Sequence, residues 1–177
     1  GRAGGASDAR MFAVITSTPN QTGRNYRIVN HKDTTTTELA KAKLQRLIEN
    51  QTSQDTTIPY EKLPYLRSIF NINLLDVNEW KDLFSVRQLV TLLTFNQLVP
   101  RASEQMGKTM DDALIDAVTT CLALVVGRLA DKLSSLARWD TSRENPQGTF
   151  GRQALPIVWD FCEINPFSGA GGDWDTA

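Results

Sequence analysis

Side chains that commonly carry out catalysis are sparse in this sequence. The single histidine, His31, stands beside Lys32 and Asp33 in a polar stretch. Nucleophilic catalysis by a serine or cysteine needs a histidine that neighbouring groups orient. The stretch offers no such arrangement, so we interpret His31 as a surface residue and predict no catalytic residue in the chain.

Two pairs of carboxylates are close enough in sequence to be considered for acid–base catalysis. Asp111 and Asp112 stand at a predicted helix start, where the helix dipole favours negative charge. Asp160 and Glu163 are three positions apart and would share one face of a helix. We interpret the first pair as helix-capping charge and the second as solvated surface charge.

The cysteines give no metal-binding pattern. Cys121 and Cys162 are the only two, and no CxxC is present. A structural zinc site needs four nitrogen or sulfur ligands, so none is predicted within this chain. Both cysteines have apolar neighbours and are predicted to be buried, reduced thiols, which is typical of a cytoplasmic protein.

Composition indicates an ordinary globular domain. Hydrophobic residues make up 41% and charged residues 22%, and the net charge is −1. Residues 1–32 hold five Lys and Arg against one Asp, whereas residues 139–177 hold two Arg against six acids. The basic end could face phosphate or pair with the acidic end. The most apolar run, residues 113–130, contains Asp116 and Arg128, so we predict a core helix and no membrane partner.

Apolar periodicity predicts the elements that must position these groups. Residues 11–15 and 26–29 read as two strands around a turn-rich segment, and they form an N-terminal β-hairpin. The predicted helices span residues 38–50, 86–99 after a Ser85 cap, 110–136, and 150–163. The glycine-rich end, 168–177, is expected to be mobile unless it is docked.

These elements predict a mainly α (α+β) fold. We expect a bundle of about five helices around a long central helix, with a small N-terminal hairpin and with helices 86–99 and 110–136 as the core pair. The organisation is a single domain: residues 1–32 form the hairpin or edge segment, 33–163 the helical domain, and 164–177 a flexible tail.

The segment TFGRQALPIVWDFCEINPFSGAGGDW, residues 149–174, is unusually rich in tryptophan, phenylalanine, proline and glycine. It resembles a block in large adenine-specific DNA methylases that contain a zinc ribbon. Further blocks resemble the same family in the same order: GRAGG with SDAR (1–10), GR with YR (23–27), WKDLF with RQL (80–89), and residues 136–140.

The resemblance implies an S-adenosylmethionine-dependent enzyme that methylates adenine N6 in DNA, as in restriction-modification or phage defence. In that family a glycine-rich cofactor motif, a zinc ribbon, a region like this one and a catalytic DPPY motif follow in order. This sequence contains none of those motifs, so we expect an internal piece that is inactive alone. S-adenosylmethionine and zinc are expected in the full-length parent, not here. The expected partners are the parent's other domains and, through the parent, double-stranded DNA.

The interval before the catalytic motif often holds target recognition, so the resemblance implies that this region positions DNA. Arginine and glutamine are side chains that hydrogen-bond to base edges. The candidate contacts are Arg10, Arg24, Arg27, Arg87, Gln88, Arg152 and Gln153. Each could instead hold a neighbouring loop, and Trp139, Trp159 and Trp174 could stack on bases or pack internally.

Two further alternatives stay open at this point. Asn165-Pro166-Phe167 resembles the general form of the catalytic motif, Asp/Asn/Ser-Pro-Pro-Tyr/Phe, without its second proline, but we interpret it as a helix-ending turn. The whole chain could also be a helical scaffold or protein-interaction module with no nucleic-acid role. Gathering of the seven candidates on one face would favour DNA recognition, and scattering would favour the scaffold.

Overall fold

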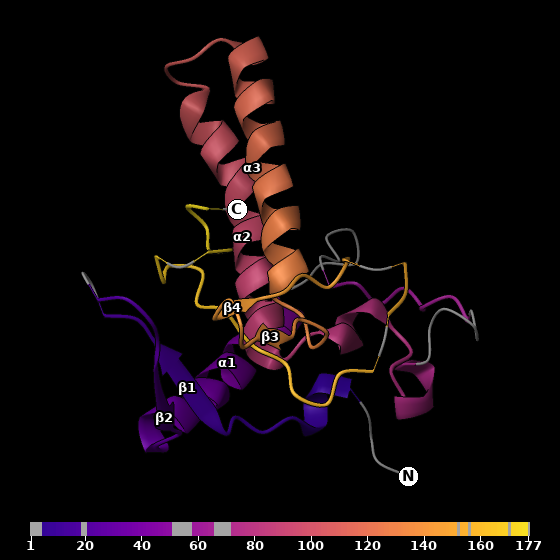
Figure 1. Ribbon diagram of the computed structural model, residues 1–177. Helices are drawn as coiled ribbons and strands as arrows, with labels where there is room; N and C mark the ends of the chain where they lie inside the picture. Colours follow the sequence, from indigo (N-terminus) through magenta and orange to yellow (C-terminus); the bar gives the residue numbers. More distant parts are fainter. Residues whose placement is uncertain are drawn as a thin grey trace.

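The computed structural model describes residues 5–18, 21–50, 58–65, 72–151, 153–155, 157–169 and 171–176. Its regular elements follow the chain as three short 3₁₀ helices (η), three α-helices and four strands, drawn in Figure 1. They are η1 (Gly5–Asp8), β1 (Ala13–Thr16), β2 (Asn25–Ile28), α1 (His31–Glu49), η2 (Ile72–Leu75), η3 (Trp80–Leu83), α2 (Val86–Met106), α3 (Asp112–Lys132), β3 (Trp139–Asp140) and β4 (Asn145–Pro146). The mainly α fold with a small N-terminal hairpin is therefore confirmed, with three α-helices in the described part of the chain rather than about five.

The N-terminal hairpin pairs β1 with β2 in antiparallel register, from Ala13 opposite Ile28 to Thr16 opposite Asn25. Every residue of β2 is exposed, so the hairpin has no core of its own. A side-chain hydrogen bond anchors it: the Tyr26 hydroxyl donates to Glu144, 3.1 Å away in the turn between β3 and β4.

Helix α1 begins at His31, seven residues before the predicted start at residue 38. A capping box explains the early start. The Asn30 side chain accepts from the backbone N–H of Lys32 and Asp33, and the Asp33 carboxylate accepts from the Asn30 N–H at 2.8 Å. These bonds satisfy backbone donors that a helix start otherwise leaves unpaired, so they offset the weak helix propensity of the four threonines that follow.

Helices α2 and α3 form an antiparallel hairpin that rises from the rest of the molecule (Figure 1). Ser85 caps α2 as predicted, in a capping box with Gln88. Pro100 lies inside α2 on its exposed side, and the helix continues to Met106 instead of ending near residue 99. Gly107 and the residues after it make the turn that reverses the chain into α3.

The prediction that the long helix is the buried centre of a bundle is wrong. Within α3 only Ile115 and Leu129 are buried, and the Leu124 side chain is 68% exposed. The reason is that, in the described part of the chain, α3 packs mainly on α2, and the outer half of this helical hairpin rises clear of the other elements (Figure 1). The packed core lies instead at the base of the helical hairpin.

By length and composition α3 could span a membrane, and it is the one such helix in the described part of the chain; 11% of its most apolar window is buried. Its run without Asp, Glu, Lys or Arg covers only residues 117–127. Eleven helical residues extend about 16 Å, roughly half of a bilayer's hydrocarbon core. Leu129 and Leu133, farther along the chain, pack inside the protein with Phe95. The expectation that the chain has no membrane partner therefore stays a prediction.

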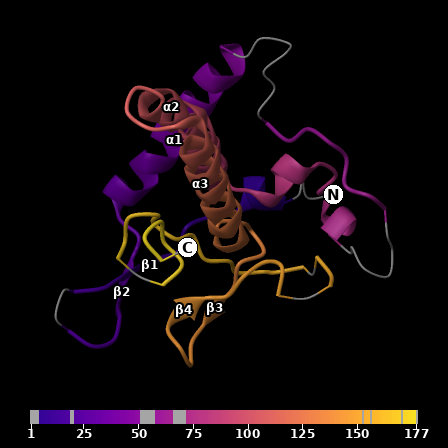
Figure 2. The same cartoon turned by 90° about the horizontal axis from the view of Figure 1, so that it is seen from above.

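Three apolar clusters form the core at the base. One joins Ile58 to α2, with α1 leucines packed against it; the second surrounds Leu83 and Leu136; the third contains Phe95, Leu129 and Leu133. Seen from above (Figure 2), the hairpin β1–β2 lies on one side of α2 and α3, and the 3₁₀ helices η2 and η3 lie on the other.

The predicted helix over 150–163 is wrong: the described residues of that range form turns, bends and irregular chain. Their backbone groups bond to other elements, not to one another along a helix. The Phe150 N–H donates to the Asp131 carboxylate, and the Cys162 N–H donates to the Ala137 carbonyl, each at 2.8 Å. Leu155 is buried in the core at the base. This segment wraps the foot of the helical hairpin.

The tail was expected to be mobile unless docked, and the described residues among 164–176 are docked. The indole of Trp174 stacks on the ring of Phe95 in α2, with centroids 4.4 Å apart and an interplanar angle of 14°. Asp173 beside it is fully buried, and the Trp174 N–H donates to the Pro166 carbonyl.

Candidate functional site

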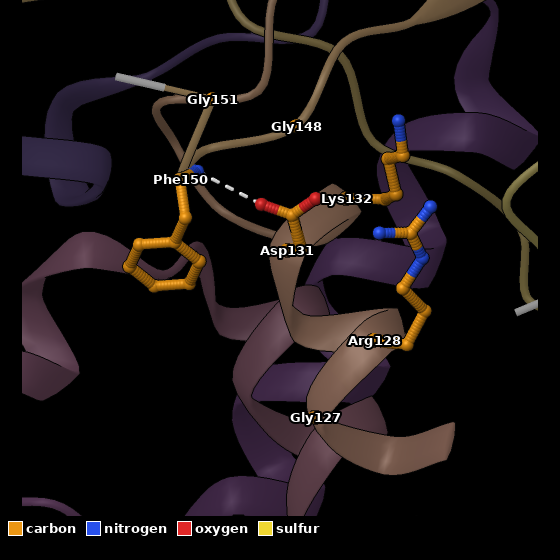
Figure 3. Close-up of a pocket in the computed structure, with 7 residues that line it drawn as sticks. All are labelled: Gly127, Arg128, Asp131, Lys132, Gly148, Phe150 and Gly151. Carbon is orange, nitrogen blue, oxygen red and sulfur yellow. Dashed lines mark hydrogen bonds between the residues drawn. The ribbon is translucent and has the colours of Figure 1, made fainter. Parts of the chain in front are cut away.

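A hollow of about 430 Å³ opens where the end of α3 meets the loop after β4, as Figure 3 shows. Two segments of the chain build it. The last turns of α3 supply a glycine, two cations and a carboxylate, and the loop supplies two glycines and an aromatic ring. The lining residues are Gly127, Arg128, Asp131, Lys132, Gly148, Phe150 and Gly151.

Asp131 fastens the loop to the helix. Its backbone carbonyl accepts from the Thr149 N–H at 2.8 Å and from the Thr149 hydroxyl at 2.9 Å. Its carboxylate Oδ1 accepts from the Phe150 N–H at 2.8 Å, the dashed line in Figure 3. The Thr149 hydroxyl also lies 2.5 Å from that of Ser134. These bonds supply partners for the Asp131 carbonyl near the helix end and fix the backbone at Phe150.

Gly148 permits this close approach. A Cβ atom at Gly148 would lie 2.1 Å from Oδ2 and 2.7 Å from Cγ of Asp131. Such contacts are impossible without moving the carboxylate, which the Phe150 N–H holds in place. The absence of a side chain at residue 148 is therefore a packing requirement of this site.

The two cations of the hollow are four residues apart on α3, a spacing that puts their side chains on the same helix face. The Arg128 side chain is exposed and has no ion-pair partner among the described residues. Lys132 Nζ donates to the Pro146 carbonyl at 3.0 Å, a neutral group that leaves its charge uncompensated. With Asp131 included, the hollow carries one net positive charge.

The Phe150 ring is 62% exposed at the opposite side of the hollow from the two cations (Figure 3). A cationic hollow beside an exposed ring can bind an anion that carries an aromatic group. It contains no serine, cysteine or histidine that could act as a nucleophile or base. In the described part of the chain no three His, Cys, Asp or Glu side chains gather as metal ligands would.

Three of the seven sequence-predicted contacts are engaged inside the protein. Arg27 makes a two-pronged ion pair with Asp33, at 2.6 and 2.8 Å, which lowers the pKa of Asp33 to about 2. Arg87 makes a similar pair with Glu163, at 2.8 Å for both bonds, and also bonds to Thr37. Gln88 is 1% exposed, and its Oε1 accepts from the Ser85 N–H.

The structure describes three of the remaining four candidates. Arg10 and Gln153 are exposed and Arg24 is half-buried, whereas Arg152 lies outside the described residues. Arg10 precedes β1 and Arg24 precedes β2, so antiparallel pairing puts them at opposite ends of the hairpin. The fold therefore does not bring Arg10 and Arg24 together.

Of the three tryptophans that were considered for base stacking, two are at least partly buried and one is exposed. Trp174 packs on Phe95, and Trp139 is half-buried in β3. Trp159 is 79% exposed.

Two motifs that could have carried chemistry have local structural roles. Asn165 Oδ1 accepts from the Phe167 N–H at 3.1 Å, so Asn165-Pro166-Phe167 forms a turn, although no helix precedes it. Asp111 caps α3 through a 3.0 Å bond from the Leu114 N–H, as predicted.

The prediction of two buried thiols is wrong for Cys121, which is exposed on α3 because none of the described elements covers that face. Cys162 is half-buried, and burial raises its pKa to about 11. The sequence reading also missed Arg128, Lys132 and Phe150. Their signal was the four-residue spacing of two cations near a helix end, which the expectation of a buried helix concealed.

No protein-family model, curated protein or solved structure matches this chain. The resemblance to adenine-specific DNA methylases therefore remains a prediction. What the chain can do is inferred from that resemblance and from the geometry of the hollow.

Proposed function

We propose that this chain is the helical insert of an S-adenosylmethionine-dependent adenine-N6 DNA methyltransferase, lying between the cofactor-binding and catalytic motifs. In this role it helps to position DNA and is inactive alone. The observation that carries the proposal is the hollow. Its two cations and exposed ring gather where residues 149–174, the segment with the most specific resemblance, begin to wrap around the hairpin.

The charge distribution supports a positioning role better than a base-reading one. Phosphate contacts fix a protein on a nucleic acid, whereas base-edge contacts specify the sequence. Arg27, Arg87 and Gln88 are engaged in the fold, so the side chains best suited to reading bases are largely occupied. Arg128 and Lys132 remain available to a phosphate.

The parent enzyme would supply everything else that the reaction needs. S-adenosylmethionine and zinc would bind to its other parts, and those parts are partners of this chain. We propose a cytoplasmic enzyme of restriction-modification or phage defence, consistent with a chain that holds two free cysteines and no disulfide between them.

One observation favours a second candidate, a helical scaffold or protein-interaction module with no nucleic-acid role. The outer half of α3 presents an apolar face to solvent, including Leu114, Cys121 and Leu124. Contiguous exposed apolar surface commonly marks a protein contact. Both roles can exist in one insert, but only the first requires nucleic-acid binding.

The deciding experiment is fluorescence anisotropy of the 177-residue chain with a labelled DNA duplex at about 50 and 200 mM salt. We expect binding that weakens with salt, since each neutralised phosphate contributes a slope of about −0.9 in log K against log salt. Absence of binding, or binding that does not change with salt, would favour the scaffold.

A second measurement tests the expectation that the chain alone is catalytically inactive. Isothermal titration calorimetry with S-adenosylmethionine should give no binding heat, and the chain alone should transfer no labelled methyl group to DNA. Methyl transfer by these 177 residues would overturn the proposed role as a non-catalytic insert.

A further inference from the structure

We propose that the hollow at the foot of α3 binds a segment of unpaired nucleic-acid strand, with Arg128 and Lys132 on a backbone phosphate and the Phe150 ring stacked on a base. This inference rests on the proposed function and assigns its DNA contact to a site absent from the sequence-predicted set.

The cations supply the phosphate contact. Arg128 and Lys132 share one face of α3, and Figure 3 shows both side chains extending on the same side of the hollow. A guanidinium can bond two phosphate oxygens at once, and an ammonium adds a compact charge. Lys132 stays anchored by the Pro146 carbonyl, so less conformational freedom is lost when the anion binds.

The glycines open the hollow to a bulky strand. A Cβ atom at Gly127 would meet nothing within 4 Å, and one at Gly151 would meet only the Gly148 carbonyl, at 3.8 Å. No side chain at these positions stands between solvent and the α3 backbone. The volume of about 430 Å³ lies within the range of small-ligand pockets, which is sufficient for one nucleotide.

Phe150 supplies the stacking surface. Its backbone N–H is held by Asp131, so the ring projects from a fixed point of the loop even though it is 62% exposed. A single exposed aromatic residue is ordinary on a protein surface. An exposed ring and two cations that outnumber the one carboxylate of the same hollow match the two halves of a nucleotide, and such sites tolerate any base.

The combination of two cations and an aromatic ring favours an unpaired nucleic-acid strand over other anionic ligands. Inorganic phosphate or an acidic peptide would use the cations but leave the ring without a partner. A paired base has both faces covered by its neighbours in the duplex, so stacking on Phe150 requires a base that has left the stack. An unpaired strand therefore satisfies the cations and the ring together.

A substitution at Asp131 tests the proposal, because it should increase the affinity for nucleic acid instead of lowering it. Its carboxylate repels a phosphate, but its bond from the Phe150 N–H needs only an acceptor oxygen. Asp131→Asn keeps that oxygen and removes the charge. We expect this variant to bind a single-stranded oligonucleotide about threefold or more tightly at low salt, since local charge affects phosphate binding directly.

The main experiment measures anisotropy of a labelled single-stranded oligonucleotide, its duplex and an abasic strand with the full chain. Arg128→Gln should flatten the salt slope by about 0.7 for the single strand. Phe150→Leu should weaken single-strand binding about fivefold or more. The matched controls are Arg101→Gln, exposed on α2, and Phe12→Leu, whose ring is 71% exposed; neither should change binding.

The abasic strand and inorganic phosphate distinguish the possible ligands. The unsubstituted chain should bind the abasic strand more weakly than the normal strand, and Phe150→Leu should abolish that difference. Millimolar phosphate should compete weakly. Equal binding of the abasic and normal strands would overturn the stacking site.

The outcomes separate this inference from the proposed function. If the chain binds DNA but the hollow variants behave like their controls, the site is wrong and the DNA-positioning role stands. If no nucleic acid binds, both fail. Photo-crosslinking of a 5-iodouracil-containing strand, mapped by mass spectrometry, provides an independent check: an adduct at Phe150 supports the site, and one confined to Trp159 overturns it.

Discussion

Arg87 in α2 and Glu163 in the wrapping segment form a two-pronged ion pair, with both N···O distances at 2.8 Å and side chains only 23% and 21% exposed. Arg87 also donates to Thr37 in α1. One guanidinium in α2 thus binds two parts of the chain that lie 50 and 76 residues from it in sequence.

This ion pair should contribute measurably to stability. A double-mutant cycle of Arg87→Ala and Glu163→Ala, followed by urea unfolding, should give a coupling of about 1–2 kcal/mol, since the pair is partly shielded from water. The exposed pair Lys41–Glu38 is the control and should couple by about 0.3–0.5 kcal/mol. Equal coupling in the two cycles would show that shielding adds nothing.

Gly148→Ala should destabilise the fold by about 1–3 kcal/mol, because the new methyl group would collide with the Asp131 carboxylate. Gly127→Ala is the matched control. It lies inside α3 with nothing within 4 Å of the added Cβ, so it should stabilise the protein by roughly 0.5–1 kcal/mol. Thermal unfolding of both variants should show a lower melting temperature for Gly148→Ala and a higher one for Gly127→Ala. A Gly148→Ala protein of unchanged stability would contradict the close approach of Gly148 to the Asp131 carboxylate.

The stack of Trp174 on Phe95 should hold the C-terminal segment in place. Trp174→Ala should cost about 2–4 kcal/mol and speed hydrogen exchange at the amides of residues 164–176. Trp159→Ala removes a side chain that is 79% exposed and should change stability by less than about 0.5 kcal/mol. Unchanged exchange in Trp174→Ala would mean that the segment is held by other contacts.

The Arg27–Asp33 pair predicts a titration at low pH. The hydrogen bonds from Arg27, followed by the Asn30 backbone bond, lower the pKa of Asp33 to about 2. A pKa that falls on folding stabilises the folded state above the unfolded value, about 3.9, and this contribution is lost as pH falls towards 2. Carbon-13 NMR of Asp33 should give a midpoint near 2 that rises in Arg27→Gln but not in Arg24→Gln.

The two thiols should differ in reactivity at pH 8. Burial raises the pKa of Cys162 to about 11, so its thiolate fraction falls on the order of 100-fold below that of an ordinary thiol. Cys121 is exposed. Ellman's reagent should therefore react in a fast phase that Cys121→Ser removes and a slow phase that Cys162→Ala removes. Two fast phases would contradict the packing of Cys162.

Local sequence signals predicted the elements whose causes are local. Ser85 and the following apolar spacing located the start of α2, and strand patterns around a turn located the N-terminal hairpin. Capping bonds and residue periodicity act within a few positions, so the sequence displays them directly. The small number of catalytic side chains is a property of composition and needed no structure.

Tertiary structure alone decided what those elements face. The apolar α3 was expected at the centre of a bundle, yet its outer half packs only on α2 and leaves Cys121 and Leu124 in solvent. The apolar residues of the segment after Thr149 have a spacing that is compatible with a helix. Its backbone instead forms hydrogen bonds with Asp131 in α3 and with Ala137, which follows α3. The hollow joins Arg128 and Lys132 to Phe150 through Asp131, across 19 residues. Periodicity tells which side chains share a face, but the partner of that face is fixed by contacts between distant segments, which no local pattern encodes.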